Sequence, residues 1–305
     1  MNDIQIYRLI RLAAVMLGHL PRPVLKFCAD ILGLVWYHAD RRHRNVVLEN
    51  IRCAYPEHFS DEQAKRFVRA NFRHTIGILF DVIWFYPKKK EKVFEYFSIK
   101  GMHHLENALE KNKGVIGLTC HMGNFELLAA AIAKTGINPY VLYRKLDFNP
   151  LEIFVREMRQ RFGTTMIPLR QASKKVEDLL RQGKLIGTLL DQNVDWYKGV
   201  FVDFFGRPAC TNNGFAKLVL KTQASVVPVF IVQKEGRFIM EFFPEIPLEK
   251  TGDKIKDIEN NTQNYVSAIE FMVRKCPEQY FWVHNRWKTR PFCMINPQLP
   301  GKGEA

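Results

Sequence analysis

The stretch TCHMGNFELLAA, residues 119–130, places a histidine and a glutamate between an apolar run and a helix-forming segment. His121 ends the apolar run and Glu126 follows five positions later. On one continuous helix the two side chains would point about 140° apart, so they can meet only if a turn separates them. A carboxylate bound to one imidazole nitrogen fixes the tautomer and leaves the other nitrogen as a proton acceptor. The pair is either a general base with its orienting partner or a structural hydrogen bond.

No enzyme nucleophile accompanies this pair. The chain has no G-x-S-x-G motif, and Ser173 and Ser225 lie in unrelated contexts. Cys120 adjoins His121, but neighbouring strand residues point to opposite faces, so we expect Cys120 to fill the core. If the pair is catalytic, the simplest chemistry is that His121 deprotonates a hydroxyl of the substrate, which then attacks an activated acyl group. Walker, G-x-G-x-x-G and H-E-x-x-H motifs are also missing.

A strand, a turn and a helix would position the pair. The run 114–120 is typical of a buried strand, Gly123 gives the turn backbone freedom, and Asn124 is suited to cap a helix that Gly136 ends. We expect further strands at 138–144, 164–169, 185–190, 225–232 and 237–243, and helices at 151–162, 172–182 and 214–222. This alternation predicts an α/β fold with a central, largely parallel mixed sheet flanked by helices. The site would lie beyond the carboxyl ends of the strands.

Residues 1–98 have mainly helical patterns, and residues 1–39 form an apolar segment of their own. Pro21 interrupts this segment, and neither half holds the roughly 20 apolar residues of a spanning helix. No clear signal-peptide cleavage site follows. We expect two helices on a membrane interface, with basic residues such as Arg22 at headgroup depth and Trp36 and Tyr37 as interfacial aromatics. The alternative is a helical hairpin buried against the rest of the protein.

We expect residues 40–305 to form one further domain, because no repeat, low-complexity tract or linker divides them. Ser60 is expected to cap a helix whose apolar residues recur at helical spacing and that Pro87 stops. The lysines at 88–90 then form either a headgroup-facing edge or a solvated run of charge.

The chain of 305 residues carries 45 Lys and Arg against 31 Asp and Glu, which is a net charge of +14. This surplus favours an anionic partner: acidic lipid headgroups, a phosphorylated substrate, an acidic protein or nucleic acid. Nucleic-acid binding is disfavoured, because the aromatic residues lie in apolar runs and no K/R-G-F/Y-type stacking motif is present. The six cysteines are scattered without zinc spacing, so we expect neither disulfides nor a metal, but reduced thiols in a cytoplasm-facing protein.

In its H-x4-D/E pattern the chain resembles the glycerolipid acyltransferase superfamily. The glutamate version is similar to the late acyltransferases of lipid A biosynthesis, the lauroyl and myristoyl transferases. The other matching blocks are RRHRNVVLENIRCAYP (41–56), YRKLDFNPL (143–151), REMRQRFG (156–163), LLDQN (189–193), VFVDFFGRPACTNNG (200–214) and PEQYFWVHNRWKTRP (277–291). The resemblance covers nearly the whole chain, and its last block is long enough to be very specific.

The resemblance implies that His121 is the base, that Glu126 is its partner, and that Arg159 and Asp191 are functional. The implied reaction moves a fatty acyl chain from acyl carrier protein to a hydroxyl of a lipid A precursor, with an acyl thioester as co-substrate and no other cofactor. The implied location is the cytoplasmic face of the bacterial inner membrane. A lysophospholipid or another glycolipid is the alternative acceptor. On its spacing alone, Asp191 is either an orienting group or a turn residue.

The matching blocks hold more than one candidate for some roles. Arg156 or Arg161 replaces Arg159 if the alignment of REMRQRFG shifts. A tetrahedral oxyanion needs a cation or N–H donors, which Arg159 or the backbone of Gly123 and Asn124 can supply. The phenylalanines of VFVDFF line an acyl slot, face the membrane or pack in the core.

Basic and polar side chains near the expected site are candidates for substrate binding. Arg144 follows a strand and can hold a phosphate or pair with an acid. Strand-like alternation in HNRWKTRP would put its cations on one face, suited to anionic headgroups or to a solvated basic edge. The candidates are Asn124, Tyr143, Arg144, Gln192, Arg286, Lys288 and Arg290.

Overall fold

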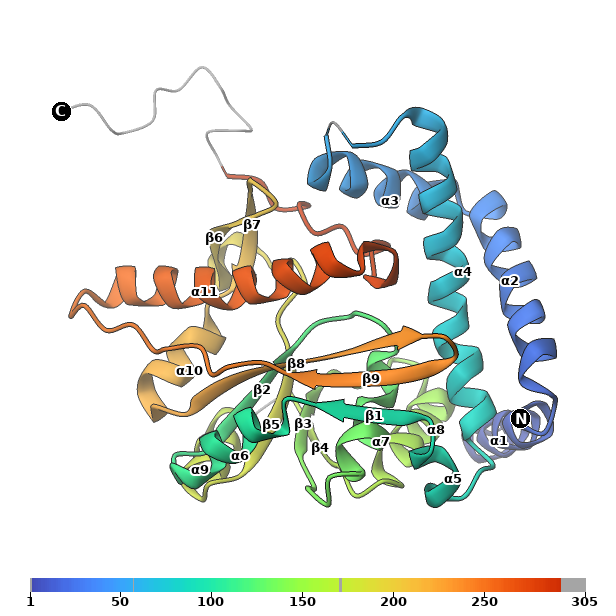
Figure 1. Ribbon diagram of the computed structural model, residues 1–305, viewed down its shortest axis with the longest axis horizontal. Coiled ribbons are helices and arrows are strands. Elements are labelled where there is room, and N and C mark those ends of the chain that lie inside the picture. Colours follow the sequence, from blue (N-terminus) through green and yellow to red (C-terminus); the bar gives the residue numbers. More distant parts are fainter. Residues whose placement is uncertain (1, 57, 170–171, 292–305) are drawn as a thin grey trace.

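Four N-terminal helices precede the sheet in a computed structural model that describes residues 2–56, 58–169 and 172–291 (Figure 1). They are α1 (Asp3–Gly18), α2 (Arg22–Ala39), α3 (Arg41–Ala54) and α4 (Asp61–Phe85). The break at Pro21 is confirmed, and so is the cap at Ser60, whose side chain accepts the backbone N–H of Gln63. As predicted, α4 stops just before Pro87, which cannot continue the intrahelical hydrogen bonds.

The sheet has seven strands in the order β1-β9-β8-β2-β5-β3-β4. All six predicted strands are present, as β2 (Val115–Thr119), β3 (Tyr140–Tyr143), β4 (Thr165–Pro168), β5 (Leu185–Leu189), β8 (Ser225–Lys234) and β9 (Arg237–Phe242). Only the β8–β9 pair is antiparallel, so the α/β class and the largely parallel mixed sheet are confirmed. Not predicted were β1 (Phe97–Lys100) and the separate antiparallel hairpin of β6 (Gly199–Phe204) and β7 (Arg207–Asn212).

Helices cover both faces of the sheet, with α11 above it and α7 below it in Figure 1. The remaining α-helices are α5 (Lys90–Phe94), α6 (Met102–Glu110), α7 (Leu128–Ala133), α8 (Asn149–Gln160), α9 (Ala172–Arg181), α10 (Gly214–Thr222) and α11 (Lys254–Lys275). Alternate residues of β2 enter different apolar clusters: Ile116 and Leu118 lie in one and Val115 in the other. Cys120 is fully buried in the cluster of Ile116, as predicted for core filler. Residues 292–305, which include Cys293 and the end of the predicted domain, lie outside the described residues.

The N-terminal helices pack with one side and expose apolar residues on the other. Trp36 and Tyr37 contact Phe72 of α4, with ring centroids 4.4 Å and 5.8 Å away. Arg22 also points inward, with its Nη2 3.1 Å from Asp81 Oδ1. All three side chains are partly buried against α4, while their predicted place at a membrane interface stays a prediction. The exposed apolar side chains are Ile4, Leu9, Leu12, Met16, Leu17, Leu20, Val24, Phe27, Ile31, Leu32, Leu34 and Val35.

None of the described helices combines the length and the apolar character that crossing a membrane requires. The exposed apolar surface of α1 and α2 nevertheless distinguishes these two helices from a hairpin buried on all sides.

The turn after β2 depends on a glycine. Gly123 has a φ of 56°, and a Cβ there would lie 1.9 Å from the carbonyl oxygen of Ile231. Gly136 is a matched control, because its φ is also positive, at 80°, while a Cβ there would meet nothing within 4 Å. We expect Gly136→Ala to lower the free energy of unfolding by about 1 kcal/mol, because it adds only the strain of a side chain on left-handed backbone.

Gly123→Ala adds a clash with backbone to the same strain and should cost roughly 2–3 kcal/mol or more. Urea unfolding of the two variants against wild type measures the difference. Equal losses would show that the close approach of Gly123 to β8 does not constrain the turn.

Candidate active site

A histidine and an aspartate meet where two neighbouring parallel strands end. His121 follows β2 and Asp191 follows β5, and the register pairs Thr119 with Leu189. The Nδ1 atom of His121 lies 2.9 Å from Asp191 Oδ1, and the backbone N–H of His121 donates to Oδ2 at 3.1 Å. The Asp191 side chain is only 4% exposed, whereas that of His121 is 19% exposed. The carboxylate therefore fixes the imidazole and leaves Nε2 outside their contact, which is the arrangement that a general base requires.

The predicted partner of His121 is occupied elsewhere. Glu126 lies in η1 (Phe125–Leu127), where its carboxylate forms two hydrogen bonds with Arg159 of α8: Oε2 with Nε at 2.8 Å and Oε1 with Nη2 at 2.7 Å. A turn does separate His121 from Glu126, as the spacing required. The expected hydrogen bond between them is nevertheless wrong, because Asp191 takes that position.

Asp191 and Glu126 act differently on the pKa of His121. Burial alone would lower the pKa of His121, but the charge and hydrogen bond of Asp191 outweigh it, so this pKa lies above its ordinary value. Burial would raise the pKa of Asp191, but His121 holds it below the usual range. Glu126 adds to the charge felt by His121 without touching it. The His121–Asp191 pair has the geometry of a base with its orienting group, and Glu126 binds Arg159 instead.

Of the three candidate arginines, only Arg159 lies at this site. Arg159 contacts Glu126, and this contact more than offsets the effect of burial, so the pKa of Arg159 is raised. Arg161 turns away and donates from Nη2 to the carbonyl oxygen of Lys88 at 2.5 Å. Arg156 is exposed on α8. The position beside His121 therefore belongs to Arg159.

Two predicted substrate-binding residues serve the scaffold. Asn124 does not cap a helix with its side chain: its Nδ2 donates to the carbonyl oxygen of Ile78 at 3.1 Å, inside the protein. The hydroxyl of Tyr143 donates to Oε1 of Glu152 at 3.0 Å, and Glu152 also accepts the backbone N–H of Leu146 at 3.0 Å. These contacts fix the turn after β2 and the loop after β3.

Two other candidates remain at the surface. Gln192 is exposed, with its Nε2 3.5 Å from Nε2 of His121. Arg144 is 82% exposed and lies 3.8 Å from Asp147. Gln192 is placed to contact a molecule that approaches His121, whereas Arg144 belongs to the loop after β3.

The C-terminal block 277–291 is not the cationic strand that its alternation predicted. Beyond the short helix η3 (Pro277–Gln279) it runs through turns, so no strand period sorts its side chains. Arg286 is 1% exposed and lies in the core, which contradicts its predicted place on a headgroup-facing surface. Lys288 and Arg290 are exposed, and Arg290 lies 3.5 Å from Glu49.

This block instead joins the two halves of the site. On the histidine side, Gly123 donates its N–H to the carbonyl oxygen of Gln279 and Phe281 donates its N–H to that of His121, both at 2.9 Å. On the aspartate side, the N–H of Asn193 donates to Nε2 of His284 at 2.8 Å. Sequence reasoning missed this role, because a main-chain contact leaves no signal in residue types.

Asn193 and Thr289 complete the aspartate side. The Nδ2 of Asn193 donates to the Thr289 hydroxyl at 3.0 Å, and the N–H of Thr289 donates back to Oδ1 of Asn193 at 3.1 Å. Asn193 is two residues from Asp191, so this pairing holds the loop that carries the carboxylate.

Aromatic rings surround His121, whereas the phenylalanines of VFVDFF are divided between core and surface. The rings of Phe125 and Phe281 have centroids 4.7 Å and 5.9 Å from that of His121. Phe204 and Phe205 are buried at 1% and 6% exposure, which supports core packing over an acyl slot, while Phe201 is 37% exposed.

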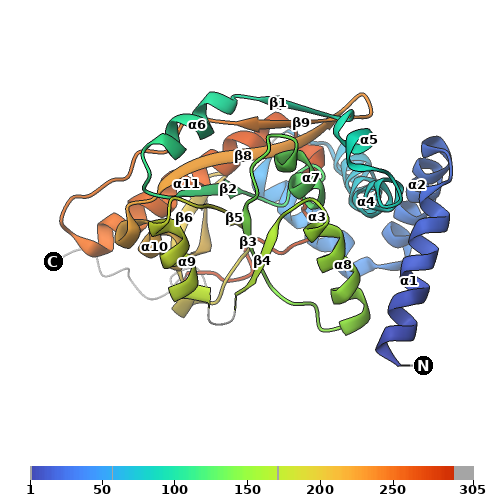
Figure 2. The ribbon, with the colours of Figure 1, turned by 90° about the horizontal axis from the view of Figure 1, so that it is seen from below.

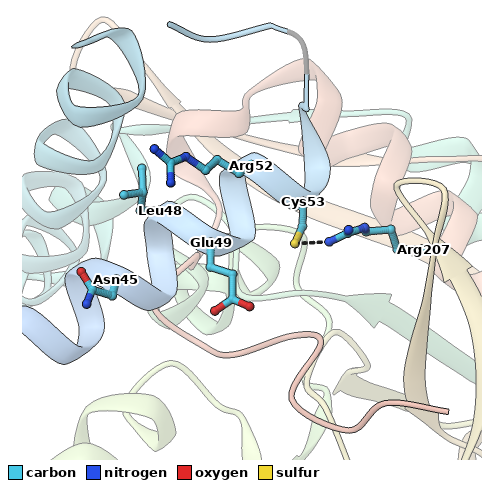
Figure 3. Close-up of a pocket in the computed structure, with 6 residues that line it drawn as sticks. All are labelled: Asn45, Leu48, Glu49, Arg52, Cys53 and Arg207. Atoms are coloured by element: carbon cyan, nitrogen blue, oxygen red, sulfur yellow. Dashed lines mark hydrogen bonds between the residues drawn. The ribbon is translucent and has the colours of Figure 1, made fainter. Parts of the chain in front are cut away.

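A separate hollow of about 500 Å³ lies between α3 and the start of β7, away from the predicted catalytic residues (Figure 3). Arg52, Glu49 and Arg207 line it, so its charges are mixed, and Arg207 contacts the Sγ of Cys53. Within the described residues, no group of three or more His, Cys, Asp or Glu is placed to hold a metal ion.

Comparison with known proteins identifies the family. A family model described as bacterial lipid A biosynthesis acyltransferase matches residues 4–289. A lipid A biosynthesis palmitoleoyltransferase of Escherichia coli K12 is 27% identical over 279 residues, which are 89% of this chain and 87% of the relative. The lauroyltransferase of that organism is 26% identical over 281 residues (89% and 88%), and its myristoyltransferase 25% over 280 residues (89% and 84%). Because the match includes the strand ends that carry His121 and Asp191, this chain belongs to the bacterial lipid A biosynthesis acyltransferase family and is an acyltransferase.

Proposed function

We propose that the protein transfers a fatty acyl chain from acyl carrier protein to a hydroxyl of a lipid A precursor, with His121 as general base. The observation that carries this proposal is the 2.9 Å contact between His121 Nδ1 and the buried Asp191 carboxylate, which leaves Nε2 outside that contact. Family membership supports the acyl transfer, and the names of the relatives support the acceptor.

The reaction needs no enzyme nucleophile. The acceptor hydroxyl gives its proton to Nε2 of His121 while its oxygen bonds to the thioester carbonyl carbon. The carbonyl oxygen becomes an oxyanion. As the tetrahedral intermediate collapses, the C–S bond breaks and the leaving thiolate takes the proton from the imidazolium. Asp191 stabilises that imidazolium, as a buried carboxylate does for a charged neighbour.

Arg159 is the better placed of the two predicted stabilisers of the oxyanion. The N–H of Gly123 already donates to the carbonyl oxygen of Gln279, so this backbone donor of the turn is not available to an oxyanion. Glu126 binds Nε and Nη2 of Arg159, which holds the guanidinium in one orientation and leaves Nη1 outside that pair. A fixed positive charge at the point where negative charge develops lowers the barrier without reorganisation.

The charge of the protein suits both proposed partners. Acyl carrier protein is acidic and lipid A precursors carry phosphates, so a chain of net charge +14 attracts each of them. Lys288 and Arg290, both exposed, remain candidates for substrate phosphates. The acyl thioester serves as co-substrate, and no further cofactor enters this scheme.

We further propose that the protein works on the cytoplasmic face of the inner membrane and lies on the bilayer. The exposed apolar side chains of α1 and α2 support this, together with exposed basic residues such as Arg8 and Lys26. The loops after β3, β4 and β5 add exposed side chains at the same sheet edge as the site: Leu146, Phe148, Leu169, Trp196 and Tyr197.

The start of α1 adjoins one of these loops. Asn149 Nδ2 donates to Asp3 Oδ2 at 2.8 Å, and in Figure 2 the loop into α8 and the N-terminus lie along the lower edge of the view. A bilayer against α1 and these loops would present the acceptor lipid at the mouth of the site.

Purified protein, acyl carrier protein loaded with a series of chain lengths, and a lipid A precursor form the direct test, read by mass spectrometry. A series is needed because relatives of nearly equal identity are named for three different acyl chains. We expect His121→Ala to lower acyl transfer at least about 10²-fold while the thermal unfolding temperature stays near that of wild type. Full turnover by this folded variant would exclude His121 as the base.

The pH dependence of kcat/KM separates the two acids of the site. The base must be neutral, so the rate rises with pH through the pKa of His121, which Asp191 raises. Asp191→Asn removes that anion, so the acid limb should move to lower pH and the plateau should fall by roughly 10²-fold. Glu126→Gln frees Arg159 and should also slow transfer, but with a smaller displacement of the limb. A larger displacement in Glu126→Gln would assign the orienting role to Glu126 after all.

Vesicle sedimentation tests the membrane proposal. The triple variant Ile4→Gln, Leu12→Gln and Met16→Gln changes exposed positions of α1, so the fold should persist. We expect binding to vesicles of phosphatidylethanolamine and phosphatidylglycerol to fall at least about tenfold, because each inserted side chain contributes roughly 1 kcal/mol or more.

Ile255→Gln with Phe271→Gln is the matched control, since these side chains are 69% and 50% exposed on the distant helix α11 (Figure 1). Equal losses in both variants would argue against a specific role of α1.

A further inference from the structure

Arg286 is a buried cation that the proposed reaction does not use. Its side chain is 1% exposed, among the largest fully buried groups of the described chain. Its polar contacts among the described residues are both to uncharged groups: Nη1 donates to the carbonyl oxygen of Cys210 at 3.0 Å and Nη2 to the hydroxyl of Thr211 at 2.5 Å. Within the part of the chain that the structure describes, its Nε has no hydrogen-bond partner. An arginine is almost never fully buried without a compensating charge, so its position calls for a physical reason.

The contacts of Arg286 lead directly to the loop of Asp191. Thr211 forms an antiparallel bridge with Asn193, and the N–H of Val194 donates to the carbonyl oxygen of Cys210 at 3.4 Å. Arg286 thus binds Cys210 and Thr211, the two residues of β7 that contact the loop after Asp191. The guanidinium also lies over the ring of Phe204, 5.3 Å from its centroid, in surroundings where charge is weakly screened.

Tyr280 connects this cation with the other half of the site. Its backbone pairs with Met122, the residue after His121, and its side chain is 2% exposed. Burial and then the charge of Asp191 hold the pKa of the Tyr280 hydroxyl well above its ordinary value, and Arg286 acts in the opposite direction. Burial lowers the pKa of Arg286 itself, and Tyr280 and Asp191 partly offset this. Arg286, Tyr280 and Asp191 therefore share one poorly screened region.

The groups of the proposed mechanism leave the buried negative charge of Asp191 without a balancing positive charge in this region. A general base must be neutral before it reacts, so His121 cannot balance the buried carboxylate of Asp191 in the resting enzyme. Arg159 lowers the pKa of His121, but Glu126, which is paired with Arg159, raises this pKa by more, so the pair supplies no net positive charge. An unbalanced buried carboxylate would be relieved by taking a proton or by keeping His121 protonated, and both outcomes remove the base.

We propose that Arg286 supplies the buried positive charge that balances Asp191 and thereby keeps His121 neutral and ready to accept a proton. Arg286 acts as a positioning residue, because it touches neither substrate nor the reacting atoms. This inference rests on the proposed role of His121 as general base. It also gives Arg286 a function in place of headgroup binding.

Neutral and charged replacements of Arg286 test the inference. Arg286→Gln removes the charge and keeps hydrogen-bond donors for Cys210 and Thr211, whereas Arg286→Lys keeps the charge. Thr211→Val is a packing control that removes one hydrogen bond of Arg286 and no charge. For each folded variant, NMR titration measures the pKa of His121, with its signal assigned by comparison with His121→Ala, and a pH profile measures kcat/KM.

Loss of the cation makes protonation of the nearby imidazole easier. In Arg286→Gln the pKa of His121 should therefore rise by on the order of one unit. The acid limb of kcat/KM should shift to higher pH by the same amount, with the high-pH plateau reduced less than the rate at neutral pH. Arg286→Lys and Thr211→Val should leave the limb within a few tenths of wild type. A merely structural role would lower the unfolding temperature and the plateau without moving the limb.

An unchanged pKa of His121 in Arg286→Gln would overturn the inference, and so would a rise in Arg286→Lys. If Arg286→Gln does not fold, Arg286→Met takes its place as the charge-removing variant, and the same rise in the pKa of His121 is expected of it. Failure of the mechanism itself is distinguishable. Full activity of His121→Ala would refute the general base, while the NMR titration would still report whether Arg286 acts on the His121–Asp191 pair.

Discussion

The buried carboxylate of Asp191 is the group on which the site depends. Its two oxygens bind the ring and the backbone N–H of His121, so one residue sets both the rotamer of the imidazole and the path of the chain that carries it. Parallel pairing of β2 and β5 makes this possible, because their last residues are in register. The antiparallel bridge between Met122 and Tyr280 then closes the turn from the other side. His121 is held by two elements far apart in sequence, so the orientation of its ring does not depend on a single loop.

A second ion pair, Glu126–Arg159, joins the turn after His121 to the N-terminal helices. Glu126 holds Arg159, and Arg159 lies on α8, which packs against α1. Glu157 of the same helix accepts the hydroxyl of Tyr7 at 2.6 Å and that of Tyr86 at 3.1 Å. The helix that presents the cation to the site is thus bound to α1 and to α4. Anything that moves α1, including contact with a bilayer, acts on the helix that carries Arg159.

Much of the fold could be predicted because buried strands and capped helices leave local patterns. Strand β2 is an unbroken apolar run, and Ser60 precedes its helix with Gln63 at the capping-box position. Strand β1 was missed, since FSIK is short, lies at the sheet edge and is only partly buried. The β6–β7 hairpin was missed because its phenylalanines suggested an apolar slot, while their packing against the C-terminal block could not be read from composition.

The site was predictable in its members but not in its pairings. His121 and Glu126 are close in sequence, so local spacing suggested that they bind each other, whereas the 70-residue separation of His121 and Asp191 hides their contact. The order of parallel strands decides which strand ends meet, and no local pattern records that order. Arg286 was misplaced for the converse reason: alternation has meaning only on a strand, and residues 281–291 form turns.

The C-terminal block shows why a long motif need not be a substrate-binding surface. Two of its polar residues bind the rest of the protein: Arg286 donates to β7, and His284 accepts the backbone N–H of Asn193. Burial lowers the pKa of His284, which keeps its Nε2 an acceptor and suits it to bind that N–H. A polar group inside a protein is costly unless it is hydrogen-bonded, so each such residue admits few replacements. The block is long because it fits the histidine turn, the aspartate loop and the hairpin at once.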